Sequence, residues 1–186
     1  KICVQAFKDA IQTNIRKEHA KILAPIVAAI RYSERILDNS KTDTYIKSDA
    51  HIIIARAAMK TNNEAKARAA YAQVKTIATG EMGAEAQYFE AFFKYLDGTH
   101  ETSNESVQEL IKKFSSYKYY AAKGLVVMAK NYYALDDSYQ ATYILESVIE
   151  NFSEYEDVTQ EAQSELDAIK TELAKTNSSV ETNDGN

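Results

Sequence analysis

Three histidines and one cysteine are the side chains of this chain best suited to hold a metal ion or to form a nucleophile and base pair. His19, His51 and His100 lie far apart in the sequence, and no HExxH or CxxC pattern brings two such ligands together. The single cysteine, Cys3, cannot form an internal disulfide, and its apolar neighbours indicate a packed thiol. We therefore predict no metal site, and a hydrogen-bonded core position for His51.

Phosphate binding and hydrolysis have equally little support in the sequence. Gly80 and Gly83 flank two residues, but no Lys-Ser or Lys-Thr follows them, as a phosphate-binding loop requires. No serine and histidine stand in a recognisable catalytic pattern. We predict no catalytic residue and no cofactor, and a protein that is not an enzyme.

Aromatic side chains offer chemistry of another kind, the recognition of a partner. Five lie between Tyr88 and Tyr95, and seven tyrosines lie between Tyr117 and Tyr143. A tyrosine combines a large apolar area with a polar tip at a low cost in conformational entropy, which suits a binding surface. Aromatic residues at helical spacing also form cores, so both placements stay open.

The elements that position these side chains repeat along the chain. A pair of residues that ends in alanine recurs after 36 and then after 38 residues, as Ile54-Ala55, Glu90-Ala91 and Met128-Ala129. A small residue lies 12 positions after each alanine. Two larger residues lie four and seven positions after that small residue. These are Ala67, Tyr71 and Val74, then Ser103, Val107 and Leu110, then Ala141, Leu145 and Val148. This spacing predicts one buried helical face, so the repeating unit is a pair of helices.

The turn between the two helices of each unit also repeats. Asn62, Gly98 and Asp136 occupy equivalent positions, and glycine and asparagine favour the left-handed conformation in which helices often end. A period of this length made of two helices predicts a solenoid.

The repeats resemble the tetratricopeptide repeat (TPR) family, most closely in the third unit. That unit carries Leu125, Met128, Ala129, Tyr132, Ala141, Leu145 and Val148. The resemblance implies an all-α fold, a right-handed superhelix of antiparallel helix pairs closed by a C-terminal capping helix. The chain departs from the family pattern because it has no tryptophan, no proline closes a unit, and Ser103 replaces an alanine.

The resemblance also implies a concave face on which extended or helical peptides dock. Seven side chains would project toward that face: Arg56, Tyr88, Phe92, Tyr95, Lys123, Lys130 and Tyr133. The polar stripe Gln87, Glu90 and Lys94 indicates instead a rotated first helix in the middle unit, with Phe92 and Tyr95 buried. The family's clamp for chaperone C-terminal carboxylates is matched only by Lys123, so we do not expect that mode.

The pattern divides the chain into six segments. We expect a degenerate helix pair over 1–40, with one helix ending near Leu23 and the next beginning at Pro25. Repeats follow over 44–78, 83–114 and 117–152. A capping helix over 157–175 begins with a capping box of Asp157 and Gln160, and 176–186 form a flexible tail. Asp43 or Thr44 would cap the first helix of the 44–78 repeat.

Composition narrows the class of partner. The net charge of −5 disfavours a nucleic-acid partner, and no apolar run is long enough for a transmembrane segment. Nine acidic residues lie between Glu146 and Glu172 against Lys170 alone, which fits either a basic partner or a solvated helix face. A protein or peptide is the expected partner.

The segment from Tyr117 to Phe152 resembles the C-terminal end of long TPR proteins from Bacteroidota-type bacteria. The resemblance implies a protein-binding scaffold of an envelope-associated assembly, in the periplasm or cell envelope of a Gram-negative bacterium. A structural spacer that self-associates is the alternative. A glycan-binding helical-repeat lipoprotein ranks last, because such proteins normally show tryptophan platforms.

Overall fold

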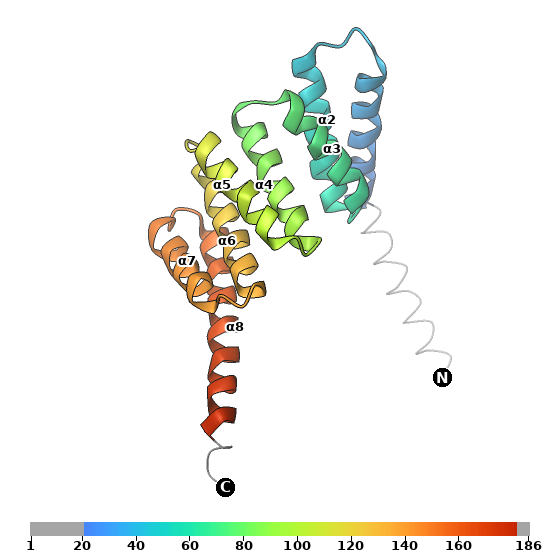
Figure 1. Cartoon of the computed structure of the whole chain (residues 1–186). Helices are drawn as coiled ribbons and strands as arrows, with labels where there is room; N and C mark the ends of the chain where they lie inside the picture. Colours follow the sequence, from blue (N-terminus) through green and yellow to red (C-terminus); the bar gives the residue numbers. More distant parts are fainter. Residues whose placement is uncertain (1–20, 182–186) are drawn as a thin grey trace, which may run out of the picture. The chain divides into compact units, whose positions relative to one another are not determined.

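The structure, a computed structural model, describes the backbone of residues 21–181 and the side chains of residues 21–175. All regular secondary structure in that part of the chain is α-helix, as the sequence predicts (Figure 1). The chain forms two compact units, Lys1–Ala78 and Thr79–Asn186, which we describe separately. The first contains a helix over 21–38, α2 (Thr44–Lys60) and α3 (Glu64–Ile77). The second contains α4 (Gly80–Leu96), α5 (His100–Lys113), α6 (Lys118–Ala134), α7 (Ser138–Asn151) and α8 (Glu156–Glu181).

The three turns inside the helix pairs have the same backbone geometry, which confirms their predicted equivalence. Asn62, Gly98 and Asp136 all have positive φ, at 54°, 72° and 62°. In each turn the amide of the residue that follows the positive-φ residue donates to the carbonyl five positions before it. These hydrogen bonds run from Asn63 to Ala58, from Thr99 to Lys94 and from Asp137 to Tyr132, at 2.9–3.0 Å. This is the Schellman motif, which ends a helix and satisfies its last carbonyl groups.

The predicted buried face is buried in all three pairs. Every residue named for the second helices has at most 3% of its surface exposed, and Ala55, Ala91 and Ala129 of the first helices have 0%. Such small residues let two helices approach closely. A second set of small residues recurs in the first helices and was not predicted: Ala50, Ala86, Gly124 and Ala162. The set extends into α8, which therefore occupies the position of a further first helix.

In the first unit, the helix over 21–38 runs through Pro25 without a break, so the predicted end near Leu23 is wrong. The proline removes only the hydrogen bond that a residue 25 amide would donate to the carbonyl of Lys21. The remainder of the predicted first helix, over 2–20, and Cys3 and His19 lie outside the described residues. Lys66 of α3 pairs with Glu34 at 2.6 Å and joins α3 to this helix.

Helix α2 of the first unit begins as the sequence predicts. Asp43 is its N-cap, and its side chain accepts a hydrogen bond from the amide of Tyr45. His51 is partly buried, and burial lowers its pKa.

In the second unit, the first helices contact one another in series, α4 with α6 and α6 with α8. Helix α5 packs against α4 of its own pair and against α6 of the next pair. Helix α7 packs against α6 and α8. The C-terminal part of α8 extends beyond its neighbours (Figure 1). None of the helices in residues 21–181 has an apolar stretch long enough to cross a membrane.

Three boundaries in the second unit differ from the prediction. Helix α4 begins at Gly80 rather than near 83, and Gly80 takes a positive φ of 63° where the chain turns into the helix. Helix α8 begins at Glu156, so Asp157 is already helical, and Gln160 donates to Glu156 rather than forming the predicted capping box. Helix α8 also continues to Glu181 rather than ending at 175, because no glycine or proline interrupts it.

The polar stripe of α4 does not rotate the helix as its composition suggested. Ala86 and Ala91 take the same buried positions as Gly124 and Ala129 of α6. Gln87, 1% exposed, instead points toward α5 and donates to the carbonyl of Ser106 at 3.1 Å. Lys94 donates to the Ser106 hydroxyl at 2.8 Å and pairs with Glu90. The stripe is therefore accommodated by polar groups of α5.

Candidate partner-binding site

Six of the seven side chains expected on the concave face belong to α4 and α6 of the second unit. Tyr88, Phe92 and Tyr95 come from α4, and Lys123, Lys130 and Tyr133 come from α6. Each helix brings its residues to one side because they are spaced three, four or seven positions apart. The seventh, Arg56, is exposed on α2 in the first unit. The structure therefore assembles a candidate site from α4, α6 and the adjoining α8.

Tyr88 is buried rather than presented to a partner, which corrects its expected role as a groove residue. It is 6% exposed and stacks on Phe92 with ring centroids 6.1 Å apart. Tyr120 of α6 covers Tyr88, with the two ring centroids 6.3 Å apart. The Tyr120 hydroxyl donates to a carboxylate oxygen of buried Glu85 at 2.8 Å. Burial is also the main cause that raises the pKa of Tyr88. Phe92 and Tyr95 are half-buried, so this aromatic row lies between core and groove.

Lys123 is held by aromatic rings. Its ammonium nitrogen lies 4.9 Å from the Tyr88 ring centroid and 5.6 Å from that of Tyr119, within the range of cation–π attraction. The Tyr119 hydroxyl donates to Asp157 of α8 at 2.8 Å. Burial and then this hydrogen bond raise the pKa of Tyr119 to about 12.

Lys130 joins α6 to α8 through two carboxylates. Its ammonium nitrogen lies 2.7 Å from an oxygen of Glu161 and 3.1 Å from one of Glu165. Burial by itself lowers the pKa of Lys130, but hydrogen bonds and charge from Glu161 and Glu165 outweigh it and raise the pKa. One cation faces two anions, so the cluster keeps a negative charge.

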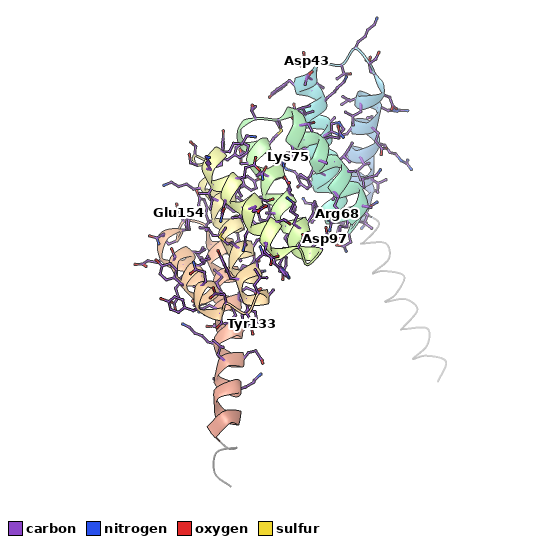
Figure 2. All side chains as sticks on the ribbon, viewed as in Figure 1. Asp43, Arg68, Lys75, Asp97, Tyr133 and Glu154 are labelled. Carbon is purple, nitrogen blue, oxygen red and sulfur yellow. The ribbon has the colours of Figure 1, made fainter. Side chains whose placement is uncertain are left out.

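A cavity of about 340 Å³ opens beside this cluster. Tyr133, labelled in Figure 2, lies near the C-terminal end of α6 and lines the cavity. Leu145 and Ile169 are buried in its wall, whereas Leu96 and Tyr133 are 48% and 39% exposed. The full lining is Tyr95, Leu96, Gly98, His100, Lys130, Tyr133, Ala134, Leu145, Glu165 and Ile169. A volume at the low end of the range for ligand pockets suits one or two side chains.

A buried polar network supports the wall formed by His100. The Nδ1 atom of His100 lies 3.0 Å from the Asn131 oxygen, and the Asn131 amide donates to Ser103 and Asn104. Ser103 in turn donates to the carbonyl of Ala91 at 2.7 Å. Because each buried polar group finds a partner, this network fixes α5 against α4 and α6.

The sequence identified three residues of the cavity lining, Tyr95, Lys130 and Tyr133, and missed the contribution of α8. Glu161 and Glu165 are one helical turn apart and belong to the acidic stretch that also fitted a solvated face. That spacing shows that the two share one side of α8, but not which neighbour they face. His100, which also lines the cavity, is the first residue of α5.

Comparisons with models of protein families, with curated proteins and with solved structures find no match to this chain. Among residues 21–175, no three His, Cys, Asp or Glu side chains cluster in a way that could hold a metal ion. The side chains gathered at the site make apolar contacts, aromatic contacts and charge pairs.

Proposed function

We propose that this chain is a non-catalytic protein-binding scaffold, a TPR-like right-handed superhelix that receives a peptide or a protein surface. The observation that carries the proposal is the cavity at the ends of α4 and α6, which gathers Tyr95, Lys130 and Tyr133. These three residues belong to the set expected to face a partner. Half-exposed aromatic and aliphatic side chains at the mouth of a cavity are typical of binding anchors.

The proposed setting is a multiprotein assembly of the periplasm or cell envelope of a Gram-negative bacterium. It rests on the resemblance of the segment from Tyr117 to Phe152 to long bacterial TPR proteins.

Capture by proximity tests the scaffold proposal. A photo-crosslinking residue replaces Leu96 at the cavity mouth, and the purified chain is irradiated in an envelope extract of its source bacterium. Mass spectrometry should find one dominant adduct, and Tyr133→Ser should remove it while circular dichroism shows unchanged helix content. The matched control Tyr139→Ser changes a tyrosine that is 79% exposed on α7 and should keep the adduct. An adduct that survives Tyr133→Ser, or the absence of any adduct, counts against the proposal.

Self-association is the second candidate, and the first unit supplies its supporting observation. Tyr32, Tyr45 and Ile46 are 66%, 69% and 46% exposed there, which leaves apolar area open to solvent. Sedimentation velocity over a wide range of concentration should then show a growing mass, and Tyr32→Lys with Ile46→Lys should abolish the growth. A constant mass would reject this candidate.

A further inference from the structure

The cavity beside Lys130 has a negative electrostatic character. Glu161 and Glu165 both pair with Lys130, and the three groups together carry one excess negative charge. Helices α4 and α6 end at the cavity with Leu96 and Ala134, and α5 begins there with His100. Two helix C-termini against one N-terminus add a further partial negative charge.

Lys130 is not available as an anchor for an acidic partner. Its ammonium group is within 3.1 Å of two carboxylates, and a third anion would have to displace one of them. Such a displacement would break an ion pair with Lys130, whose side chain is only 18% exposed. The cavity therefore disfavours an aspartate, a glutamate or a C-terminal carboxylate.

The sequence of the second unit as a whole carries the same sign of net charge. Residues 79–186 contain 20 acidic and 8 basic side chains, so the second unit attracts cations over a distance. The apolar area that an occupant can cover in the cavity belongs mainly to Leu96 and Tyr133, which are 48% and 39% exposed. An occupant thus gains from an apolar side chain inside and a positive charge at the mouth.

We propose that the cavity binds a protein segment in which a leucine or an aromatic residue is flanked by arginine or lysine. This inference rests on the proposed scaffold function and specifies the chemistry of the partner. The apolar side chain packs against Tyr95, Leu96 and Tyr133 of the lining. The basic residue lies near Glu165 and the carbonyl ends of α4 and α6, where its charge is stabilised.

Titration of the full chain with three capped peptides, followed by NMR, tests the proposal. The peptides are Ac-Gly-Arg-Leu-Arg-Gly-NH₂, its glutamate analogue Ac-Gly-Glu-Leu-Glu-Gly-NH₂ and the neutral Ac-Gly-Ser-Leu-Ser-Gly-NH₂. The arginine peptide should shift the amide signals of Gly98 and Ala134, which line the cavity, and bind more tightly than the neutral peptide. The signals of Tyr139 and Tyr143, exposed on α7, should stay in place. The glutamate peptide should cause no shift.

A charge variant sharpens the test. Glu165→Gln should weaken binding of the arginine peptide by about threefold, the usual effect of one partly exposed charge pair. Glu146→Gln is the matched control, because Glu146 pairs with Lys170, neither residue lines the cavity, and both side chains are 55% exposed. It should leave the affinity unchanged.

Two results would overturn the inference: equal shifts from the arginine and glutamate peptides, or no shift at the cavity amides. The crosslinking experiment at Leu96 remains independent of these peptides. A specific adduct there, together with a failed peptide titration, would reject the basic character of the partner and leave the scaffold function standing.

Discussion

Helices α4 and α5 form one pair in the second unit, and α6 and α7 form the next pair 38 residues later. The two pairs share their turn geometry, with positive φ at Gly98 and at Asp136. They also share fully buried alanines at Ala91 and Ala129. Their backbones are therefore built by the same local rules.

The interfaces inside the two pairs differ in chemistry. Helix α7 packs on α6 through apolar groups, among them Ala141, Leu145 and Val148, each 0% exposed. The α4/α5 interface also buries Gln87 and Ser103, whose side chains donate to the carbonyls of Ser106 and Ala91. A repeat can thus replace apolar contacts by hydrogen bonds without changing its backbone, provided that each buried polar group finds a partner.

Truncation of a buried leucine in either pair should have the largest effect. Leu145→Ala in α7 and Leu110→Ala in α5 each remove a side chain with 0% exposure. We expect each to lower the free energy of unfolding by about 3 kcal/mol, from lost burial and the cavity left behind. Urea denaturation measures both values. A much smaller loss for Leu110→Ala would mean that the polar pair does not depend on its apolar core.

Gly124 of α6 should resist enlargement although α4 carries an alanine, Ala86, at the same position. A Cβ atom on Gly124 would lie 3.0 Å from a methyl carbon of Leu110 and 3.2 Å from one of Val107. We expect Gly124→Ala to lower the free energy of unfolding by about 2 kcal/mol, because overpacking outweighs the gain in helix propensity. The reverse change, Ala86→Gly, should cost about 1 kcal/mol through propensity and lost contact. A stabilised Gly124→Ala variant would show that α5 and α6 can move apart freely.

Exchange of the equivalent residues Ser103 and Ala141 tests whether the hydrogen bonds of the polar pair are needed. Ser103→Ala restores the alanine found in the other repeats but removes partners of Asn131 and of the Ala91 carbonyl. We expect it to destabilise the chain by about 1.5 kcal/mol, because buried polar groups lose their partners.

The opposite change, Ala141→Ser, should cost a similar amount because it buries a hydroxyl in an apolar interface. Thermal unfolding of both variants measures these two losses of stability. An increase in stability for Ser103→Ala would reject the network as a structural requirement.

The turns offer a smaller contrast between the same two pairs. Gly98 has a positive φ and no atom within 4 Å of where its Cβ would be, so the effect of Gly98→Ala is conformational. We expect a loss of about 1 kcal/mol. Asp136→Gly at the matching position should stabilise the chain by a few tenths of a kcal/mol. Glycine relieves the strain of the left-handed conformation, but it loses more backbone entropy on folding, and the two effects nearly cancel. Equal responses in chemical denaturation would contradict a shared left-handed turn.

The last expected effect is confined to the alkaline limb of stability. The folded pKa of Tyr119 is raised to about 12, above its ordinary value near 10, so the folded state holds this proton more tightly. The resulting stability is complete below about pH 10 and is lost as the pH rises toward about 12. Tyr119→Phe should reduce the fall in melting temperature across this window. Tyr139→Phe, a change in an exposed residue of α7, should leave the fall as it is in the parent chain.

The sequence alone predicted the helix pairs, their turns and their buried faces. Periodicity was sufficient because a helix repeats every 3.6 residues, so spacing alone shows which side chains share a face. The left-handed turns at Asn62, Gly98 and Asp136 were also predictable, because few residue types tolerate positive φ. Local rules did not predict that the helix over 21–38 passes Pro25 or that α8 continues to Glu181.

The candidate site depended on the tertiary structure. Spacing placed Tyr88 and Lys130 on one side of their helices, but only packing decided that Tyr120 covers Tyr88. Likewise, nothing in the acidic stretch of α8 shows that Glu161 and Glu165 meet Lys130. These contacts join residues about 30 positions apart, and their geometry is set by how closely α4, α6 and α8 approach one another. Helical periodicity fixes the face of each helix, whereas the small residues at the interfaces decide which faces meet.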